Sequence, residues 1–286
     1  MQAILCGVLF FLIILGAGVR IADAGLACPD WPFCFGELIP PFNFQIFMEW
    51  IHRVIAGSVG LLQLAIAVWV FSKPHLRKLC GYLVGLSLIL FAVQANLGRQ
   101  TVTELLNPKF VNSHLMGGYL LLAANLWILH RLTRVTMNCS IQSGKILLIE
   151  SSICLVLIFL QATVGGTVSS HYAGLVCPDF PTCQGQWIPE LTGLVAVKFF
   201  HRWGGFVLLA ISILMATSIF KRAEDRKLQK IWIAICGLIC VQIGIGIGMI
   251  YTLIHPGLAL LHAAVSVSLF TLFVVSHFRL RKAVCN

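Results

Sequence analysis

The sequence predicts an all-α integral membrane protein whose eight transmembrane helices form two four-helix bundles. Three observations predict this fold: the composition, the lengths of the apolar runs and an internal repeat. Hydrophobic residues make up 59% of the 286 residues and charged residues only 10%, too few to coat a soluble globular protein of this length. The net charge of +10 is therefore interpreted as a record of membrane topology and not as a nucleic-acid footprint.

Each predicted helix is an apolar run close to the ~20 residues that cross a bilayer core. The first run is interpreted as a membrane helix and not as a cleaved signal peptide, because Met1 to Gly18 lacks a basic start and is followed by Arg20 and Asp23. The eight runs cover residues 3–19, 51–71, 79–98, 112–129, 146–168, 199–219, 231–250 and 257–277.

The basic residues set the predicted orientation. Fourteen of the twenty lie in the connections after the second, fourth and sixth runs or in the C-terminal tail, which the positive-inside rule places in the cytoplasm. Both termini are then cytoplasmic, and the two cysteine-containing loops lie outside the cell membrane. The fourteen are Lys73, Arg77, Lys78, Arg131, Arg134, Lys145, Lys221, Arg222, Arg226, Lys227, Lys230, Arg279, Arg281 and Lys282.

A repeat divides the chain into halves at residues 1–145 and 146–286. Residues 174–189 match residues 25–40 at ten of sixteen positions with an offset of 149, and the same offset carries His52 and Arg53 onto His201 and Arg202. Each half contains an even number of helices, so both have the same orientation in the membrane. We therefore expect a pseudo-two-fold axis along the membrane normal.

Four of the eleven cysteines lie in the two outer loops of the repeat. Cys28 and Cys34 share the first loop, and Cys177 and Cys183 share the second. An oxidising compartment predicts a disulfide within each pair, whereas zinc ligation is the alternative. The remaining cysteines are expected to be free thiols: Cys6, Cys80, Cys139, Cys154, Cys236, Cys240 and Cys285.

Four of the nine histidines recur at the outer start of the even-numbered helices. They are His52, His114, His201 and His262, two in each half. A single histidine at a helix end is usually an interfacial residue, but ionisable groups repeated within membrane helices indicate function. Two imidazoles from facing helices suit axial ligation of a haem iron. The other five histidines lie outside the repeated pattern and are given no ligand role.

The neighbours of these histidines are small or basic. Gly117 and Gly118 follow His114 at three and four residues, and Gly204 and Gly205 follow His201 in the same way, which exposes a bare helix face for a flat macrocycle. Ordinary close helix packing is the alternative explanation. Arg53 and Arg202 are candidate contacts for haem propionates, or they extend to the membrane interface.

The repeat is broken one turn before the first histidine of each half. Glu49 precedes His52 by three residues, whereas Lys198 occupies the equivalent position before His201. A carboxylate beside a haem edge suits proton handling during an oxidation, which makes Glu49 the candidate catalytic residue. The alternative is an acidic residue in the first turn of a helix, which the helix dipole favours.

Together these motifs resemble the haem A synthase family of membrane proteins over essentially the whole chain. The resemblance rests on the doubled Gly-Leu-x-Cys-Pro-Asp-x-Pro-x-Cys-x-Gly loop, Glu49-Trp-x-His-Arg, Pro108 before His114, Gly165-Gly166-x-Val and the late His262. It implies oxidation of the C8 methyl of haem O to a formyl group, which gives haem A for the terminal cytochrome oxidase. His52 and His114 would then bind the substrate haem beside Glu49, and His201 and His262 would ligate a resident haem b.

Two other classes of function stay open on the sequence. One is a bis-histidine b-type membrane cytochrome that relays electrons between quinol and an outer disulfide. The other is a haem-handling transporter or chaperone with haem as its cargo. Expected partners are haem O, the lipid bilayer, a haem O synthase, an electron donor and a second copy of the chain, with no nucleic acid.

Overall fold

The computed structural model describes residues 1–41, 43–133 and 144–284, and within these residues it is all-helical apart from loops and isolated bridges. Eight of the described helices are long and apolar enough to cross a membrane, which confirms the predicted fold class. They are α1 (Gln2–Ile21), α2 (Phe44–Phe71), α3 (Pro74–Thr103), α4 (Pro108–Leu132), α5 (Gly144–Ser170), α6 (Gly193–Arg222), α7 (Arg226–Tyr251) and α8 (Pro256–Val284).

Most of the helices extend well beyond the apolar runs that predict them. Polar residues outside the runs cap several N-termini: Asn43 accepts a hydrogen bond from the Ile46 amide at 2.8 Å, and Asn107 accepts one from the Lys109 amide at 3.1 Å. Hydropathy marks only the part of a helix that is apolar, so it underestimates helices whose ends are capped at the membrane surface. The four histidines consequently lie about two turns inside their helices.

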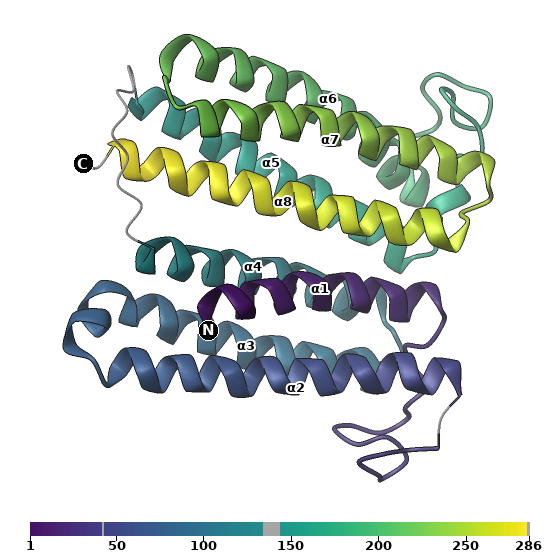
Figure 1. The fold of residues 1–286 in the computed structure, drawn as a ribbon. Coiled ribbons are helices and arrows are strands. Elements are labelled where there is room, and N and C mark those ends of the chain that lie inside the picture. Colours follow the sequence, from purple (N-terminus) through teal and green to yellow (C-terminus); the bar gives the residue numbers. More distant parts are fainter. Residues whose placement is uncertain (42, 134–143, 285–286) are drawn as a thin grey trace. The chain divides into compact units, whose positions relative to one another are not determined.

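The chain divides into two compact units, Met1–Arg134 and Val135–Asn286. In the first unit α1 packs against α2 and α4, and α3 packs against α2 and α4. In the second unit α5 packs against α6 and α8, and α7 packs against α6 and α8. Each unit is therefore a closed four-helix bundle in which helices adjacent in sequence are adjacent in space (Figure 1).

The core of each bundle is apolar, with a few buried polar contacts between helices. In the first unit the Gln63 side chain on α2 donates to the Ser87 hydroxyl on α3 at 3.0 Å. In the second unit the indole of Trp232 on α7 donates to the Ser276 hydroxyl on α8 at 2.7 Å. Such side-chain hydrogen bonds satisfy polar groups that would otherwise face hydrocarbon. Fully buried apolar side chains surround them, including Leu5, Ile66, Leu83, Leu121, Leu122, Leu147, Ile235 and Phe273.

The repeat is visible in the backbone as well as in the sequence. Leu105 and Leu106, between α3 and α4, have positive φ angles of 49° and 58°, and their equivalents Leu253 and Ile254 have 51° and 61°. Both units thus end their third helix with the same unusual turn. The rotation axis that we expect to relate the halves stays a prediction.

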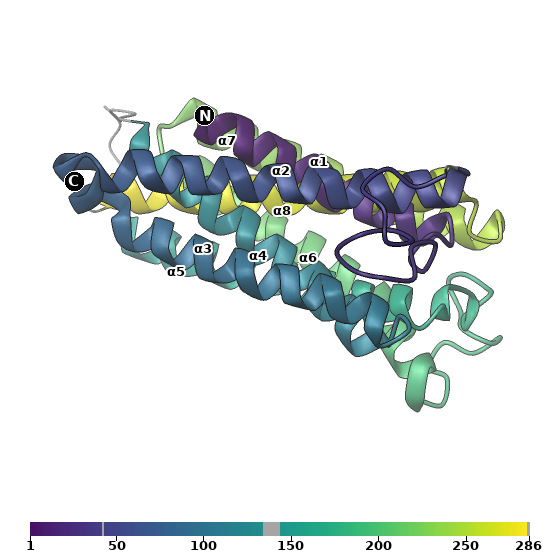
Figure 2. The same cartoon turned by 90° about the horizontal axis from the view of Figure 1, so that it is seen from below.

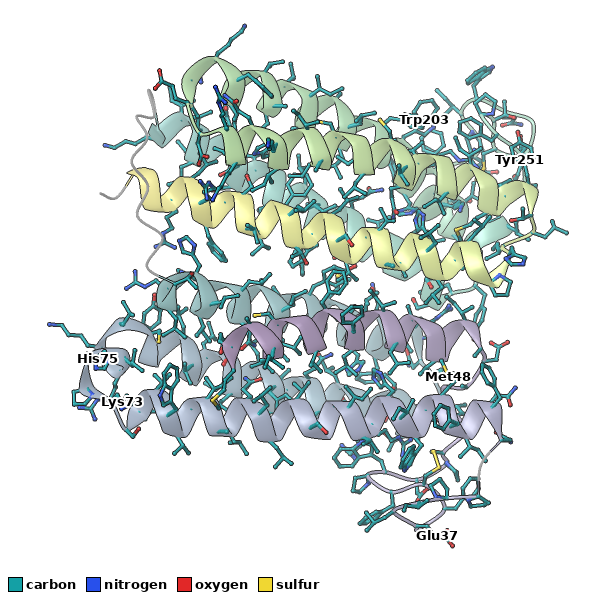
Figure 3. All side chains as sticks on the ribbon, viewed as in Figure 1. Glu37, Met48, Lys73, His75, Trp203 and Tyr251 are labelled. Carbon is teal, nitrogen blue, oxygen red and sulfur yellow. A yellow bond between two sulfur atoms is a disulfide. The ribbon has the colours of Figure 1, made fainter. Side chains whose placement is uncertain are left out.

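Long loops join the first and second helices of each bundle. Figure 2 shows the 22–43 loop of the first unit against the N-terminal end of α2. In Figure 3, Glu37 of this loop and Met48 lie at one end of the unit, whereas Lys73 and His75 lie at the other. The basic α2–α3 connection and the cysteine loop are thus at opposite ends, as the predicted topology requires.

Candidate functional site

A disulfide closes the outer loop of each unit. Cys28 and Cys34 are bonded, and so are Cys177 and Cys183. The two predicted disulfides are therefore confirmed, and zinc ligation by these cysteines is excluded. The predicted free thiols are confirmed for Cys6, Cys80, Cys154, Cys236 and Cys240, while Cys139 and Cys285 lie outside the described residues.

An aspartate holds each loop from within. The carboxylate of Asp30 accepts hydrogen bonds from the amides of Phe35 and Gly36 at 2.6 and 2.7 Å. Both bonds lower the pKa of Asp30 below its usual value, and the bond from the Gly36 amide has the larger effect. Both donors have positive φ angles, 58° and 73°, so the carboxylate stabilises a turn that L-residues rarely adopt.

The second loop repeats the arrangement. Asp179 accepts from the amides of Gln184 and Gly185 at 2.7 and 3.0 Å and from the hydroxyl of Thr182. The Thr182 hydroxyl, followed by the Gly185 amide, lowers the pKa of Asp179 to about 2. The Cys-Pro-Asp motif is therefore a structural unit that both halves use in the same way.

One arginine ties each loop to the helix that carries a histidine. Arg53, next to His52, donates to the carbonyl oxygens of Asp30 at 2.6 Å and Cys28 at 3.1 Å, and also to that of Phe33. Arg202 does the same in the second unit, donating to the carbonyl oxygens of Pro181, Thr182 and Cys177. These bonds fix the loops over the histidine ends of the bundles, and a role of either arginine at haem propionates stays a prediction.

Glu49 is buried and bonded to the loop as well as to the arginine. Its side chain accepts from the Cys28 amide at 2.9 Å and pairs with Arg53 at 2.5 Å. It lies in the second turn of α2 and not in the first, so an ordinary helix-dipole charge does not explain it. Its equivalent Lys198 lies in electrostatic range of both His201 and His262. The two units thus differ in charge at the same place beside the histidines.

Each of the four histidines packs against a glycine of the preceding helix. A Cβ atom at Gly16 would lie 3.1 Å from Cε1 of His52, and one at Gly98 would lie 3.0 Å from Cε1 of His114. The corresponding distances are 2.7 Å between Gly165 and His201 and 3.5 Å between Gly246 and His262. The imidazoles therefore occupy space that a larger residue on α1, α3, α5 or α7 would fill.

Sequence reasoning noticed the glycines that follow the histidines along their own helices, but it missed these partners on the neighbouring helices. Their spacing is a usable signal, since 36 residues separate Gly16 from His52 and also Gly165 from His201. The interval of 16 residues recurs for Gly98 with His114 and for Gly246 with His262.

The histidines of each unit lie close enough to act as a pair. The ring centres of His201 and His262 are 6.4 Å apart, and His52 and His114 occupy the equivalent positions on α2 and α4 of the first unit. Two imidazoles that ligate one metal ion from opposite sides have ring centres about 6 Å apart, because metal–nitrogen bonds are about 2 Å long. Nδ1 of His52, His114 and His262 is buried without a hydrogen-bond partner. The residues present therefore fit bis-histidine ligation of a haem iron.

The other histidines take part in local contacts. Nδ1 of His277 is 3.0 Å from the Ser151 hydroxyl, and Nδ1 of His171 is 3.0 Å from the Thr167 carbonyl oxygen. His255 accepts from the Gly257 amide at 3.2 Å. None of these three is paired with a second imidazole in the contacts described, and the absence of a ligand role for them stays a prediction.

Similarity to characterised families covers nearly the whole chain. A family model described as "Cytochrome oxidase assembly protein" (COX15-CtaA) matches residues 2–45 and 41–274. A protein named Heme A synthase from Shewanella oneidensis is 30% identical, with 95% of this chain and 93% of that protein covered. Proteins of the same name from Halalkalibacterium halodurans and Rickettsia prowazekii are 30% and 25% identical, with 90% and 96% of this chain and 88% and 95% of those proteins covered. The chain therefore belongs to the COX15-CtaA family of cytochrome oxidase assembly proteins.

Proposed function

We propose that this protein is a haem A synthase, an oxidoreductase that converts the C8 methyl group of haem O into a formyl group for the terminal cytochrome oxidase. The observation that carries the proposal is a pair of equivalent histidine pairs of which, within the described part of the chain, only the first has a buried carboxylate beside it. Two electron-relay sites would have no chemical reason to differ at this position. The shared name of the relatives supports the same reaction.

The first unit is the proposed substrate site. His52 and His114 hold the iron of haem O from α2 and α4, and the glycines behind them admit the imidazoles. Glu49 lies one turn from His52 on the same face of α2, where its carboxylate would accept a proton released as the methyl group is oxidised. Its bonds to Arg53 and to the Cys28 amide hold the carboxylate in place. The disulfide loop covers this end of the bundle and limits access of water.

The second unit is the proposed cofactor site. His201 and His262 ligate haem b, which when bound supplies electron transfer. Lys198 and Arg202 give this end of the bundle two positive charges, which suits the two carboxylates that a haem carries. Haem O synthase, an electron donor and a second copy of the chain are the proposed partners. The proposed location is the cell membrane, with both termini cytoplasmic and the disulfide loops outside.

The two histidine pairs provide the test. Replacing His201 or His262 with Ala should remove the tightly bound haem b, whereas replacing His52 or His114 should leave haem b bound and abolish conversion. Chromatography of pigments extracted from purified protein, made in cells that produce haem O, measures both properties. Haem b at two per chain without haem A or a hydroxylated haem O would instead identify an electron-relay cytochrome.

Glu49→Gln tests the carboxylate separately, because glutamine keeps the shape and an acceptor for the Cys28 amide. Conversion should fall by about 10²- to 10⁴-fold, the usual contribution of a general acid–base group, while haem b content stays normal. Glu37→Gln is the matched control, since Glu37 is an exposed acid in the loop that Glu49 contacts. Normal haem A production by Glu49→Gln would contradict the proposed role.

A further inference from the structure

Three of the four histidines share a contact that the proposed chemistry does not use. A glutamine lies four residues before the glycine that packs on the histidine, and its side-chain amide donates to the main-chain carbonyl oxygen of that histidine. The distance is 2.7 Å from Gln94 to His114, 2.7 Å from Gln161 to His201 and 3.0 Å from Gln242 to His262. Each bond joins an odd-numbered helix to the next even-numbered helix at the level of the imidazole.

The even-numbered helices make room for two of these glutamines. A Cβ atom at Gly117, three residues after His114, would lie 2.3 Å from Oε1 of Gln94. One at Gly204, three residues after His201, would lie 2.4 Å from Oε1 of Gln161. These glycines therefore accommodate a glutamine from the neighbouring helix. At the equivalent position after His262 stands Val265, and there the hydrogen bond is the longest of the three.

Among the residues that the structure describes, no glutamine makes this contact with the fourth histidine, His52. Leu12 lies four residues before Gly16 on α1, where α3, α5 and α7 have glutamine, and Ile55 stands three residues after His52. Leucine has no group that can donate to the His52 carbonyl, and isoleucine does not leave the space that glycine leaves. The two halves of the repeat thus differ at a second position, again beside His52.

We infer that Gln94, Gln161 and Gln242 are positioning residues that hold three of the haem-ligating histidines, and that His52, which lacks such a residue, is the ligand that releases the substrate haem. This inference rests on the proposed function. Gln161 also lies 3.3 Å from Nδ1 of His201, and a partner at this ring nitrogen orients a ligating imidazole and strengthens metal binding. In all three cases a part-buried hydrogen bond between helices resists their separation in the membrane. Both cofactor ligands are held in this way. Only one ligand of the substrate haem is held, which suits a site that must release its product.

The first test concerns the second unit and needs no turnover. Gln161→Met keeps the size of the side chain and removes the donor, so haem b should pass from the purified protein to apomyoglobin about five- to tenfold faster, as expected for the loss of one hydrogen bond. The low-spin signal of this haem in electron paramagnetic resonance should also shift, because the orientation of the His201 ring changes.

Gln63→Met is the matched control for this measurement. Like the half-buried Gln161, the buried Gln63 makes an interhelical hydrogen bond, to Ser87, but it belongs to a contact away from the paired histidines. Gln63→Met should leave both haem readouts unchanged. Equal rates and equal spectra for Gln161→Met and Gln63→Met would overturn the positioning role, whether or not the protein proves to make haem A.

The second test installs the missing contact. The double variant Leu12→Gln/Ile55→Gly reproduces at His52 the glutamine and glycine found at the other sites. Haem O and haem A should then leave the first unit about five- to tenfold more slowly, and more of them should remain bound after purification. Gln94→Met is the companion variant and should speed their release. Unchanged release in a folded double variant would overturn the assignment of His52 as the releasable ligand. Unchanged release in Gln94→Met would overturn the positioning role of Gln94.

Discussion

The tightest contact behind an imidazole lies at Gly165, and it gives a sharp test of the cofactor site. In Gly165→Ala the new Cβ atom would lie 2.7 Å from Cε1 of His201, whereas ordinary contact begins at 3.4 Å. The ring must therefore move by about 0.7 Å, and Nδ1 at 3.3 Å restricts the directions it can take. Overpacking of this kind costs about 1–3 kcal/mol, which corresponds to about 5- to 140-fold weaker haem binding.

The bundle itself should tolerate the substitution. Gly165 is inside α5, and alanine is favoured over glycine by about 1 kcal/mol in a helix interior. Gly246→Ala is the matched control, because its Cβ atom would lie 3.5 Å from Cε1 of His262, an ordinary contact. The assay is haem content per purified chain together with transfer of haem to apomyoglobin, and circular dichroism during heating reports the fold. Equal haem retention by the two variants would refute the reasoning.

Three further predictions follow from charged groups. Lys198→Met should release haem b faster than the wild-type protein does, and the difference should shrink at high salt as screening grows; a salt-independent difference would contradict an electrostatic cause. Arg279→Leu should lower the free energy of unfolding by about 2 kcal/mol in denaturant titration, because Asp225 loses its partner. Although burial raises the pKa of Asp225, hydrogen bonds from Arg279 and the Leu228 amide lower it overall. The stabilisation by the Asp225–Arg279 pair is therefore present above the pKa of Asp225 in the unfolded chain, and it is lost as the pH falls through the lower pKa of the folded protein. The pKa of Asp179 is likewise lowered, to about 2, so its ionised carboxylate should slow reduction of the Cys177–Cys183 disulfide by a phosphine at pH 7. This protection should disappear between about pH 4 and pH 2, as the carboxylate is protonated. Asp179→Asn should show fast reduction already at pH 7.

The sequence predicts the architecture well, because hydropathy and the repeat both act over long stretches of chain. Eight apolar runs predict eight helices, and an offset of 149 predicts that the disulfide loops are built alike. The disulfides and the pairing of His201 with His262 were also predictable, since they follow from topology and from equivalence between the halves. The ends of the helices were not predicted, because capping residues such as Asn43 determine where a helix begins, whereas the apolar residues do not.

Contacts between side chains on different helices were harder to predict. The hydrogen bond from the Cys28 amide to Glu49 forms only because the loop folds back over α2. No spacing of residues in the sequence indicates that this loop folds back. Three of the partners of Arg53 are main-chain carbonyl oxygens, which sequence motifs do not show. The glutamines of α3, α5 and α7 were overlooked for a different reason. Each is an ordinary polar residue in a membrane helix until the structure shows the histidine carbonyl beside it.

Two independent differences between the halves point in the same direction. Beside His201 and His262, Lys198 and Arg202 add two positive charges, while in the first unit Glu49 neutralises Arg53. A haem with two carboxylates would therefore be bound more favourably by charge in the second unit than in the first. The glutamine contacts also favour retention in the second unit, because both of its histidines accept such a hydrogen bond, whereas none is described for His52. Since an electrostatic difference and a positional difference both favour retention in one unit and release in the other, the same two-histidine plan suits the proposed cofactor site in the second unit and the proposed substrate site in the first.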